Sequence, residues 1–145
     1  MKELSPQSIR DCLCPLFRKH AEVQFAFLFG SYAKGRANRL SDIDIAVQVD
    51  WNLIGEIPPY GYKADFIADL MQCLHTNLVD LVVLNNAPIL LKFQVLYHGQ
   101  LMFCRDKAAR IAFQVDTINR YQDFKHLRIP HHKAFTEKYR PVKND

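Results

Sequence analysis

The sequence predicts an α/β protein built on a small mixed β-sheet flanked by helices. Two patterns lead to this prediction. Short runs of apolar, β-branched and aromatic residues, which are typical of buried strands, alternate with longer segments in which apolar residues recur every three or four positions, as on one face of a helix. The chain has 145 residues, 49% of them hydrophobic, which is enough for one domain with a single core.

The first third of the chain is expected to form one helix and two strands. Ser5 and Pro6 suit the N-cap and the first position of a helix. A later apolar run ends at Gly30, and from Asp42 onward apolar and polar residues alternate, which predicts a strand with one apolar face. The predicted elements are a helix from Pro6 to about Lys19, a strand at 23–29, a helical turn and loop at 31–40, and a strand at 42–50.

The rest of the chain continues the alternation of helices and strands. The predicted elements are a loop at 51–62, a helix at 63–74, a strand at 79–84, a helix at 89–97, a short edge strand at 101–104, and a long helix from 106 to about 127. We interpret residues 1–145 as one domain, with the C-terminal helix and tail, about 106–145, packing on it. Because the long helix carries apolar residues on more than one side, a second interpretation is that part of it contacts a partner.

Composition and charge exclude several classes of protein. Lys and Arg exceed Asp and Glu by 19 − 15 = 4, which suits a protein that handles phosphates but is too small an excess to indicate nucleic-acid binding. No apolar run approaches the roughly 20 residues that span a bilayer, and the first ten residues lack the apolar core of a signal peptide. The four cysteines lack zinc-site spacing, so we expect reduced, mostly buried thiols and a cytoplasmic protein.

Three acidic residues indicate a metal-dependent site. Asp42 and Asp44 are two apart on a predicted strand, so their carboxylates are expected on the same face. Asp80 interrupts an otherwise apolar strand, and if that strand lies beside the first, the three carboxylates form a cluster. Such a cluster needs cations, and two Mg²⁺ ions held there would clamp an in-line phosphoryl displacement. Asp80 is then the candidate to accept the proton of the attacking hydroxyl.

A second group of residues indicates nucleotide binding. Gly30 and Ser31 directly follow a predicted strand, where glycine permits close approach of a phosphate and serine adds a hydroxyl. Lys34, Arg36 and Arg39 lie in the same segment and are candidates to offset the charge of a triphosphate. Each feature alone is weak, but their combination is specific.

The combination resembles a known signature. Gly30-Ser31, ten residues and then Asp42-x-Asp44 resemble the motif of the polymerase-β-type nucleotidyltransferase superfamily. The segments FLFGSYAKGRANRLSDIDIAV, VDLVVLNNAPILLKFQVLYHGQLMFCRD and RYQDF resemble more closely the minimal nucleotidyltransferases, the antitoxins of HEPN/MNT toxin–antitoxin modules. The resemblance extends from about Val23 to Tyr139.

The resemblance implies a nucleotidyltransferase fold, ATP as substrate, two Mg²⁺ ions, and transfer of AMP to a tyrosine of a partner HEPN ribonuclease, which silences it. By motif position, Asp42, Asp44 and Asp80 match the metal-binding acids, and Gly30 and Ser31 the phosphate-contacting pair. It further implies a hetero-oligomer with the toxin, with nucleic acid not the direct substrate. All five motif positions are kept, so an active enzyme is expected.

Two alternatives remain open at this point. The chain can neutralise a toxin by tight steric association, a hypothesis that its long apolar C-terminal helix favours. It can instead modify a small molecule such as an antibiotic. Larger members of the superfamily hold such substrates with a second domain, and the sequence shows none, which favours a protein acceptor.

Overall fold

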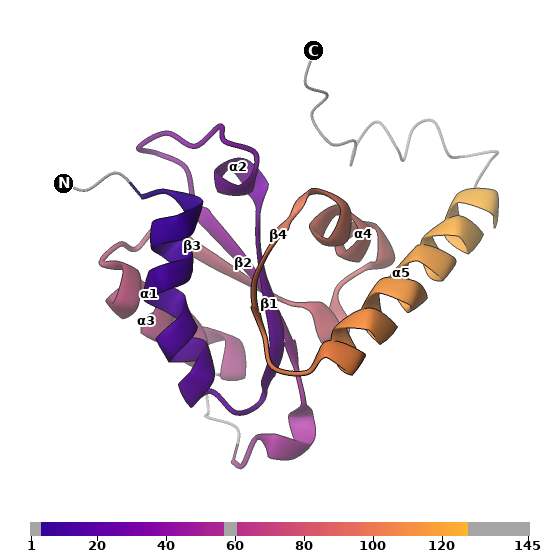
Figure 1. Cartoon of the computed structure of the whole chain (residues 1–145), viewed down its shortest axis with the longest axis horizontal. Coiled ribbons are helices and arrows are strands. Elements are labelled where there is room, and N and C mark those ends of the chain that lie inside the picture. The colour runs from indigo at the N-terminus through magenta and orange to yellow at the C-terminus, as the bar shows by residue number, and fades with distance from the viewer. Residues whose placement is uncertain (1–3, 57–60, 128–145) are drawn as a thin grey trace.

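A four-stranded sheet forms the centre of the fold, in the order β3-β2-β1-β4 (Figure 1). The computed structural model describes residues 4–56 and 61–127. β1 runs antiparallel to β2 and β4, whereas β2 and β3 are parallel, so the predicted mixed sheet is confirmed. The strands are β1 (Val23–Phe29), β2 (Ile43–Val49), β3 (Val79–Val83) and β4 (Gln100–Cys104), and β4 lies at a sheet edge as expected.

Two helices, α1 (Pro6–Lys19) and α3 (Tyr62–Leu74), cover one face of the sheet (Figure 1). α1 begins where predicted, because the Ser5 hydroxyl accepts a hydrogen bond from the Ser8 amide in a capping box. The buried apolar side chains of both helices pack against alternate residues of the strands, since period-two side chains share a face. The largest members of this core are Ile9, Leu13, Phe17, Leu28, Ile43, Ile45, Phe66, Leu70 and Leu81.

The opposite face is covered by α4 (Ile89–His98) and α5 (Lys107–Leu127) (Figure 1). A smaller buried cluster lies here, made of Phe25, Phe27, Ala46, Leu84 and Val95, with Phe113 of α5 packed against it. The first half of α5 thus contacts this cluster through Ala109 and Phe113. No helix within the described ranges, α5 included, is long and apolar enough to cross a membrane.

Short elements join the strands and fix where the polar residues lie. α2 (Gly30–Ala33) follows β1, η1 (Trp51–Leu53) follows β2, and η2 (Leu84–Asn86) follows β3. β2 begins at Ile43, whose amide donates a hydrogen bond to the Leu78 carbonyl at 2.8 Å. Asp42 therefore lies one residue before the strand, whereas the sequence analysis placed it within the strand. The basic tail beyond residue 127 falls outside the described residues.

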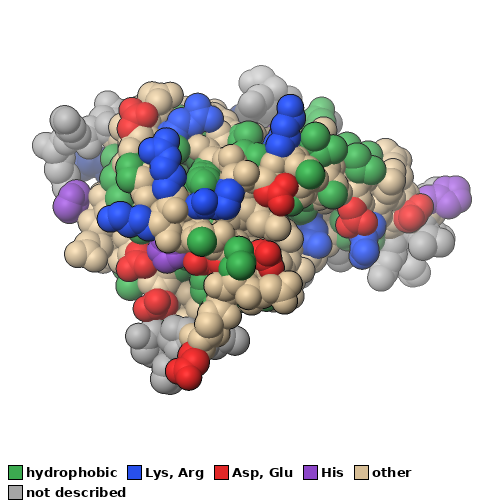
Figure 2. All heavy atoms as spheres, turned by 60° about the horizontal axis from the view of Figure 1, so that its bottom comes forward, with side chains coloured by type: hydrophobic (Ala, Val, Ile, Leu, Met, Phe, Trp, Pro, Cys, Tyr) green, Lys and Arg blue, Asp and Glu red, His purple; other side chains and the backbone are tan. Residues whose placement is uncertain are grey.

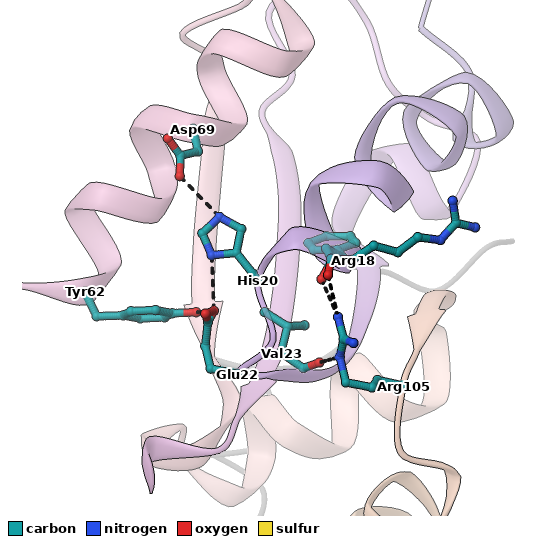
Figure 3. A network of polar contacts seen from close by, with 8 residues as sticks. Arg18, His20, Glu22, Val23, Tyr62, Asp69 and Arg105 are labelled. Atoms are coloured by element: carbon teal, nitrogen blue, oxygen red, sulfur yellow. Dashed lines mark hydrogen bonds and ion pairs between the residues drawn. The ribbon is translucent and has the colours of Figure 1, made fainter. Parts of the chain in front are cut away.

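Two polar side chains fasten the end of α1 to the rest of the molecule (Figure 3). His20, the C-cap residue, lies between Glu22 at 3.1 Å and Asp69 of α3 at 3.2 Å, and the Tyr62 hydroxyl donates to Glu22. Burial, followed by the charge and hydrogen bond of Glu22, raises the pKa of Tyr62 above its ordinary value.

The second fastening side chain is Arg105, which follows β4. It donates to the carbonyls of Phe17, Arg18 and Val23 (Figure 3). A guanidinium placed there satisfies helix-end carbonyls that have no partner within the helix. It therefore joins the start of the C-terminal segment to the end of the first helix.

Candidate active site

Two neighbouring strands bring Asp44 and Asp80 together at one end of the sheet, and Asp42 lies just before β2. Asp44 of β2 is paired with Phe29 of β1 on one side and with Asp80 of β3 on the other. Its neighbours in sequence, Ile43 and Ile45, belong to the core beneath α1 and α3, so Asp44 projects from the opposite face. Asp80, in register on a strand about 4.8 Å away, projects beside it. The predicted neighbourhood of the two strands is confirmed.

Asp42 and Asp80 flank the central carboxylate and are both exposed. Asp42 stands in the loop two residues before Asp44 and close enough for its charge to act on it. One oxygen of Asp80 accepts a hydrogen bond from the Leu81 amide at 2.9 Å, which fixes the orientation of the carboxylate. The three acids therefore differ in setting, with one half-buried group between two exposed ones.

The central acid is held where its charge is unfavourable. Burial, and then the charges of Asp80 and Asp42, raise the pKa of Asp44 from 3.8 to about 6. A carboxylate in that position gains most from a positive ligand, because a cation offsets both the lost hydration and the repulsion between like charges. A cation bound beside Asp44 would therefore stabilise the folded chain.

A glycine lies directly against this carboxylate. Gly30, the first residue of α2, has φ +73°, and a Cβ on it would lie 2.1 Å from Oδ2 of Asp44. Both the backbone conformation and the contact disfavour a larger side chain, which would require the Asp44 carboxylate to move. The sequence indicated a role for Gly30 in approaching a phosphate, but it gave no sign of this contact with the acid. Gly30 and Asp44, fourteen residues apart in the sequence, thus form one packed unit.

The remaining predicted residues lie on α2 and the loop after it. Ser31 is half-buried in α2, and Lys34 caps that helix, with its amide donating to the Gly30 carbonyl. Arg36 and Arg39 are exposed and form no ion pair within the described part of the chain. The structure therefore places Lys34 beside the glycine and leaves the two arginines in the solvent-exposed loop.

Two residues near α2 were not predicted from the sequence. The Gln100 side chain donates to the Ala33 carbonyl at 2.8 Å, and this hydrogen bond links β4 to the end of α2. His98, at the end of α4, is close enough to Lys34 that burial, and then the lysine charge, lower the pKa of His98. Neither position is recognisable in the sequence, because the contacts join segments more than sixty residues apart.

The acids fit a divalent ion through their chemistry rather than through a preformed cage. Among the described residues, no three His, Cys, Asp or Glu groups are arranged as a metal site. Asp44 and Asp80 nevertheless share a face in register, and burial and the neighbouring carboxylates raise the pKa of Asp44, so a cation there would be favourable. Mg²⁺ commonly takes only one or two protein carboxylates and completes its shell with water and substrate phosphates.

Comparisons with known proteins agree with this geometry. Residues 12–108 match the family described as polymerase beta, nucleotidyltransferase. The protein adenylyltransferase MntA of Shewanella oneidensis is 34% identical over 101 residues, which are 70% of this chain and 68% of that protein.

Solved structures give the same result. A toxin–antitoxin crystal structure with AMP-PNP has a TM-score of 0.71 and 28% identity, covering 88% of this chain and 98% of that one. A structure of a tri-AMPylated Shewanella oneidensis HEPN toxin in complex with an MNT antitoxin has a TM-score of 0.66 and 26% identity, covering 90% and 98%.

The contact between Gly30 and Asp44 predicts unequal effects of two glycine substitutions. Gly35 has nearly the same φ, +72°, but nothing lies within 4 Å of a Cβ placed there. We expect Gly35→Ala to lower the free energy of unfolding by about 1 kcal/mol, the left-handed backbone term alone. Gly30→Ala should lower the free energy of unfolding by clearly more, as measured by urea denaturation, because its methyl group must displace the Asp44 carboxylate.

Combining Gly30→Ala with Asp44→Ala should remove most of the additional loss of stability. Equal losses for the two glycines would contradict the contact.

The raised pKa of Asp44 predicts a gain in stability on neutralising it. Because the folded-state pKa of about 6 lies above the ordinary 3.8, the charged form destabilises the native state above about pH 6, and this penalty disappears below about pH 4. Asp44→Asn should therefore raise the melting temperature at neutral pH without divalent ions, and the gain should vanish as pH falls from about 6 to 4. The exposed Asp123→Asn is the control. A gain independent of pH would refute this origin.

Proposed function

This chain belongs to the polymerase beta nucleotidyltransferase family, and from that premise we propose that it is a protein adenylyltransferase that transfers AMP from ATP to a tyrosine of a HEPN-type toxin and thereby neutralises it. The observation that carries the proposal is the packed unit of Gly30, Asp44 and Asp80. In this unit the half-buried Asp44 lies between the turn at Gly30, which we assign to phosphate binding, and the second acid, Asp80.

We assign the triphosphate to the α2 side of this unit. There the Ser31 hydroxyl is available as a donor, and Lys34 supplies charge at the end of α2. Arg36 and Arg39 lie further along the same loop and are assigned to the outer phosphates. Their exposure and freedom from ion pairs in the described residues support this role, because they meet an incoming anion without breaking an existing contact.

Asp42, Asp44 and Asp80 are the residues that would hold Mg²⁺. When bound, the ions offset the charge of the pyrophosphate leaving group and favour ionisation of the acceptor hydroxyl. The hydroxyl oxygen attacks the α-phosphorus, a P–O bond forms, and the bond to the β-phosphate oxygen breaks to release pyrophosphate. Asp80, exposed at the β3 side and away from the triphosphate turn, is assigned as the acceptor of the hydroxyl proton.

The acceptor is inferred from the relatives. MntA is named a protein adenylyltransferase, and a structural neighbour contains a tri-AMPylated HEPN toxin with an MNT antitoxin. The exposed setting of Asp80 supports an acceptor that arrives on the surface of another protein. This assignment makes the chain the antitoxin of a toxin–antitoxin system, acting in a complex with its toxin.

The surface of α5 favours a second contribution, steric masking of the toxin. Ile111, Val115 and Ile118, at helical positions i, i+4 and i+7, are 45%, 53% and 39% exposed. The opposite side of the helix, including Phe113 and the buried Thr117, packs on the domain. A helix with apolar residues on both sides fits a helix that packs on its own domain and on a partner. We assign this stripe to toxin contact.

Removing the two acids of the motif tests the chemistry. Asp42→Asn combined with Asp44→Asn should lower labelling of a cognate HEPN protein, incubated with Mg²⁺ and labelled ATP, by about a hundredfold or more, because the charge that positions the phosphates is lost. Asp65→Asn, an exposed acid in the first turn of α3, should label like the parent. Undiminished labelling by the double variant would refute the assignment.

A charge on the α5 stripe tests the binding surface. Val115→Glu should weaken the complex with the toxin about tenfold or more, as measured by calorimetry, because a carboxylate would be buried against apolar atoms. Ala112→Glu adds the same charge at an exposed position on a different side of the helix from the stripe and should bind like the parent. Rescue of toxin-expressing cells by the Asp42/Asp44 double variant, but not by Val115→Glu, would show that masking rather than modification dominates.

A further inference from the structure

Two cysteine thiols from different helices touch on the face of the sheet opposite the candidate active site. Cys12 of α1 and Cys73 of α3 have their Sγ atoms 3.0 Å apart. Both side chains are half-buried against the larger core. They lie 61 residues apart in sequence, so their contact is a product of the tertiary fold.

The hydrogen bonds of the pair are reciprocal. Cys12 Sγ donates to the Cys73 carbonyl at 3.0 Å, and Cys73 Sγ donates to the Cys12 carbonyl at 3.1 Å. The Cys73 carbonyl belongs to the last turn of α3, where carbonyls lack partners within the helix. The two thiols are thus held in one orientation, each aimed at the helix that carries the other.

Burial, and then the hydrogen bond and charge of Cys12, raise the pKa of Cys73 to about 12. Thiol–disulfide exchange proceeds through the thiolate, so this thiol starts the reaction slowly. Once an oxidant has modified one sulfur, however, the second lies in contact with it. The two thiols are therefore expected to form a disulfide because their sulfur atoms are in contact, and not because either thiol is unusually reactive.

We propose that Cys12 and Cys73 are a site of reversible oxidation that forms a disulfide between α1 and α3. One thiol attacks a small-molecule disulfide such as oxidised glutathione, giving a mixed disulfide and one reduced thiol. The other protein sulfur then attacks the first and expels the second reduced thiol. In total the protein loses two hydrogen atoms, and the oxidant gains them. The Sγ atoms must approach from 3.0 Å to about 2.05 Å, a shift within reach of side-chain rotation.

The bond would join the two helices that cover the larger core and would enclose β1, α2 and β2 within a covalent loop. A closed loop of about sixty residues restricts the unfolded chain, and the unfolding equilibrium constant is expected to fall about a thousandfold. The other two cysteines have no such contact. Cys14 Sγ donates to the Met102 carbonyl, and Cys104 is exposed on β4. The inference does not depend on the proposed function.

The test is oxidation of the purified full chain with oxidised glutathione, followed by alkylation, intact mass and peptide mapping. Trypsin leaves Cys12 and Cys14 on one peptide, residues 11–18, so the Cys14→Ser variant serves as the parent for mapping. The expected product has lost two hydrogen atoms, carries a link between residues 11–18 and 64–92, and melts at a higher temperature. Reduction with dithiothreitol should reverse all three changes.

Matched variants decide the outcome. Cys12→Ser and Cys73→Ser should each abolish the link and the gain in melting temperature, whereas Cys104→Ser should keep both. Mixed glutathione adducts on Cys12 or Cys73 without loss of two hydrogen atoms would overturn the proposal. A gain in melting temperature that persists in Cys12→Ser would overturn it as well.

Discussion

The structure depends on one unfavourable interaction that the fold keeps in place. The Asp44 carboxylate is partly removed from water, paired in register with Asp80 and pressed against the backbone of Gly30. Nothing within the described chain neutralises it. The two hydrophobic clusters on either side of the sheet hold β1, β2 and β3 in the register that forces these groups together. The core thereby holds a carboxylate at one end of the sheet in a setting that a bound cation would stabilise.

The elements and the main acids were accessible from the sequence because they depend on local periodicity. The alternation from Ile43 to Val49 and the apolar run before Gly30 predict β2 and β1 correctly, and a single Asp in the β3 pattern marks Asp80. The contact of Gly30 with Asp44 was not accessible, since it depends on the way α2 turns back over β2. The position of Asp42 outside the strand depends on one hydrogen bond, from Ile43 to Leu78. The contacts of Gln100 and Cys73 join distant segments, and no local pattern records them.

The two faces of the sheet have different tasks. The face under α1 and α3 carries the larger apolar core, and polar contacts of His20 and Arg105 join the end of α1 to neighbouring segments. The other face is shared between a smaller core, the acids and α5 with its exposed apolar stripe. The acids and α5 therefore lie on the same side of the sheet, and the contact between Cys12 and Cys73 lies on the opposite side.

The contact of Gly30 with Asp44 also has an evolutionary consequence. Because a Cβ at position 30 would overlap the carboxylate at position 44, a larger residue at position 30 requires that carboxylate to move, and substitutions at the two positions are therefore expected to be coupled. If a descendant lost Asp44 to a small residue, the steric part of the restriction on position 30 would disappear, although the positive φ would still favour glycine or asparagine. In relatives that have lost the activity, we therefore expect substitutions of the acid at position 44 first. Substitutions of the glycine at position 30 should follow later and less often.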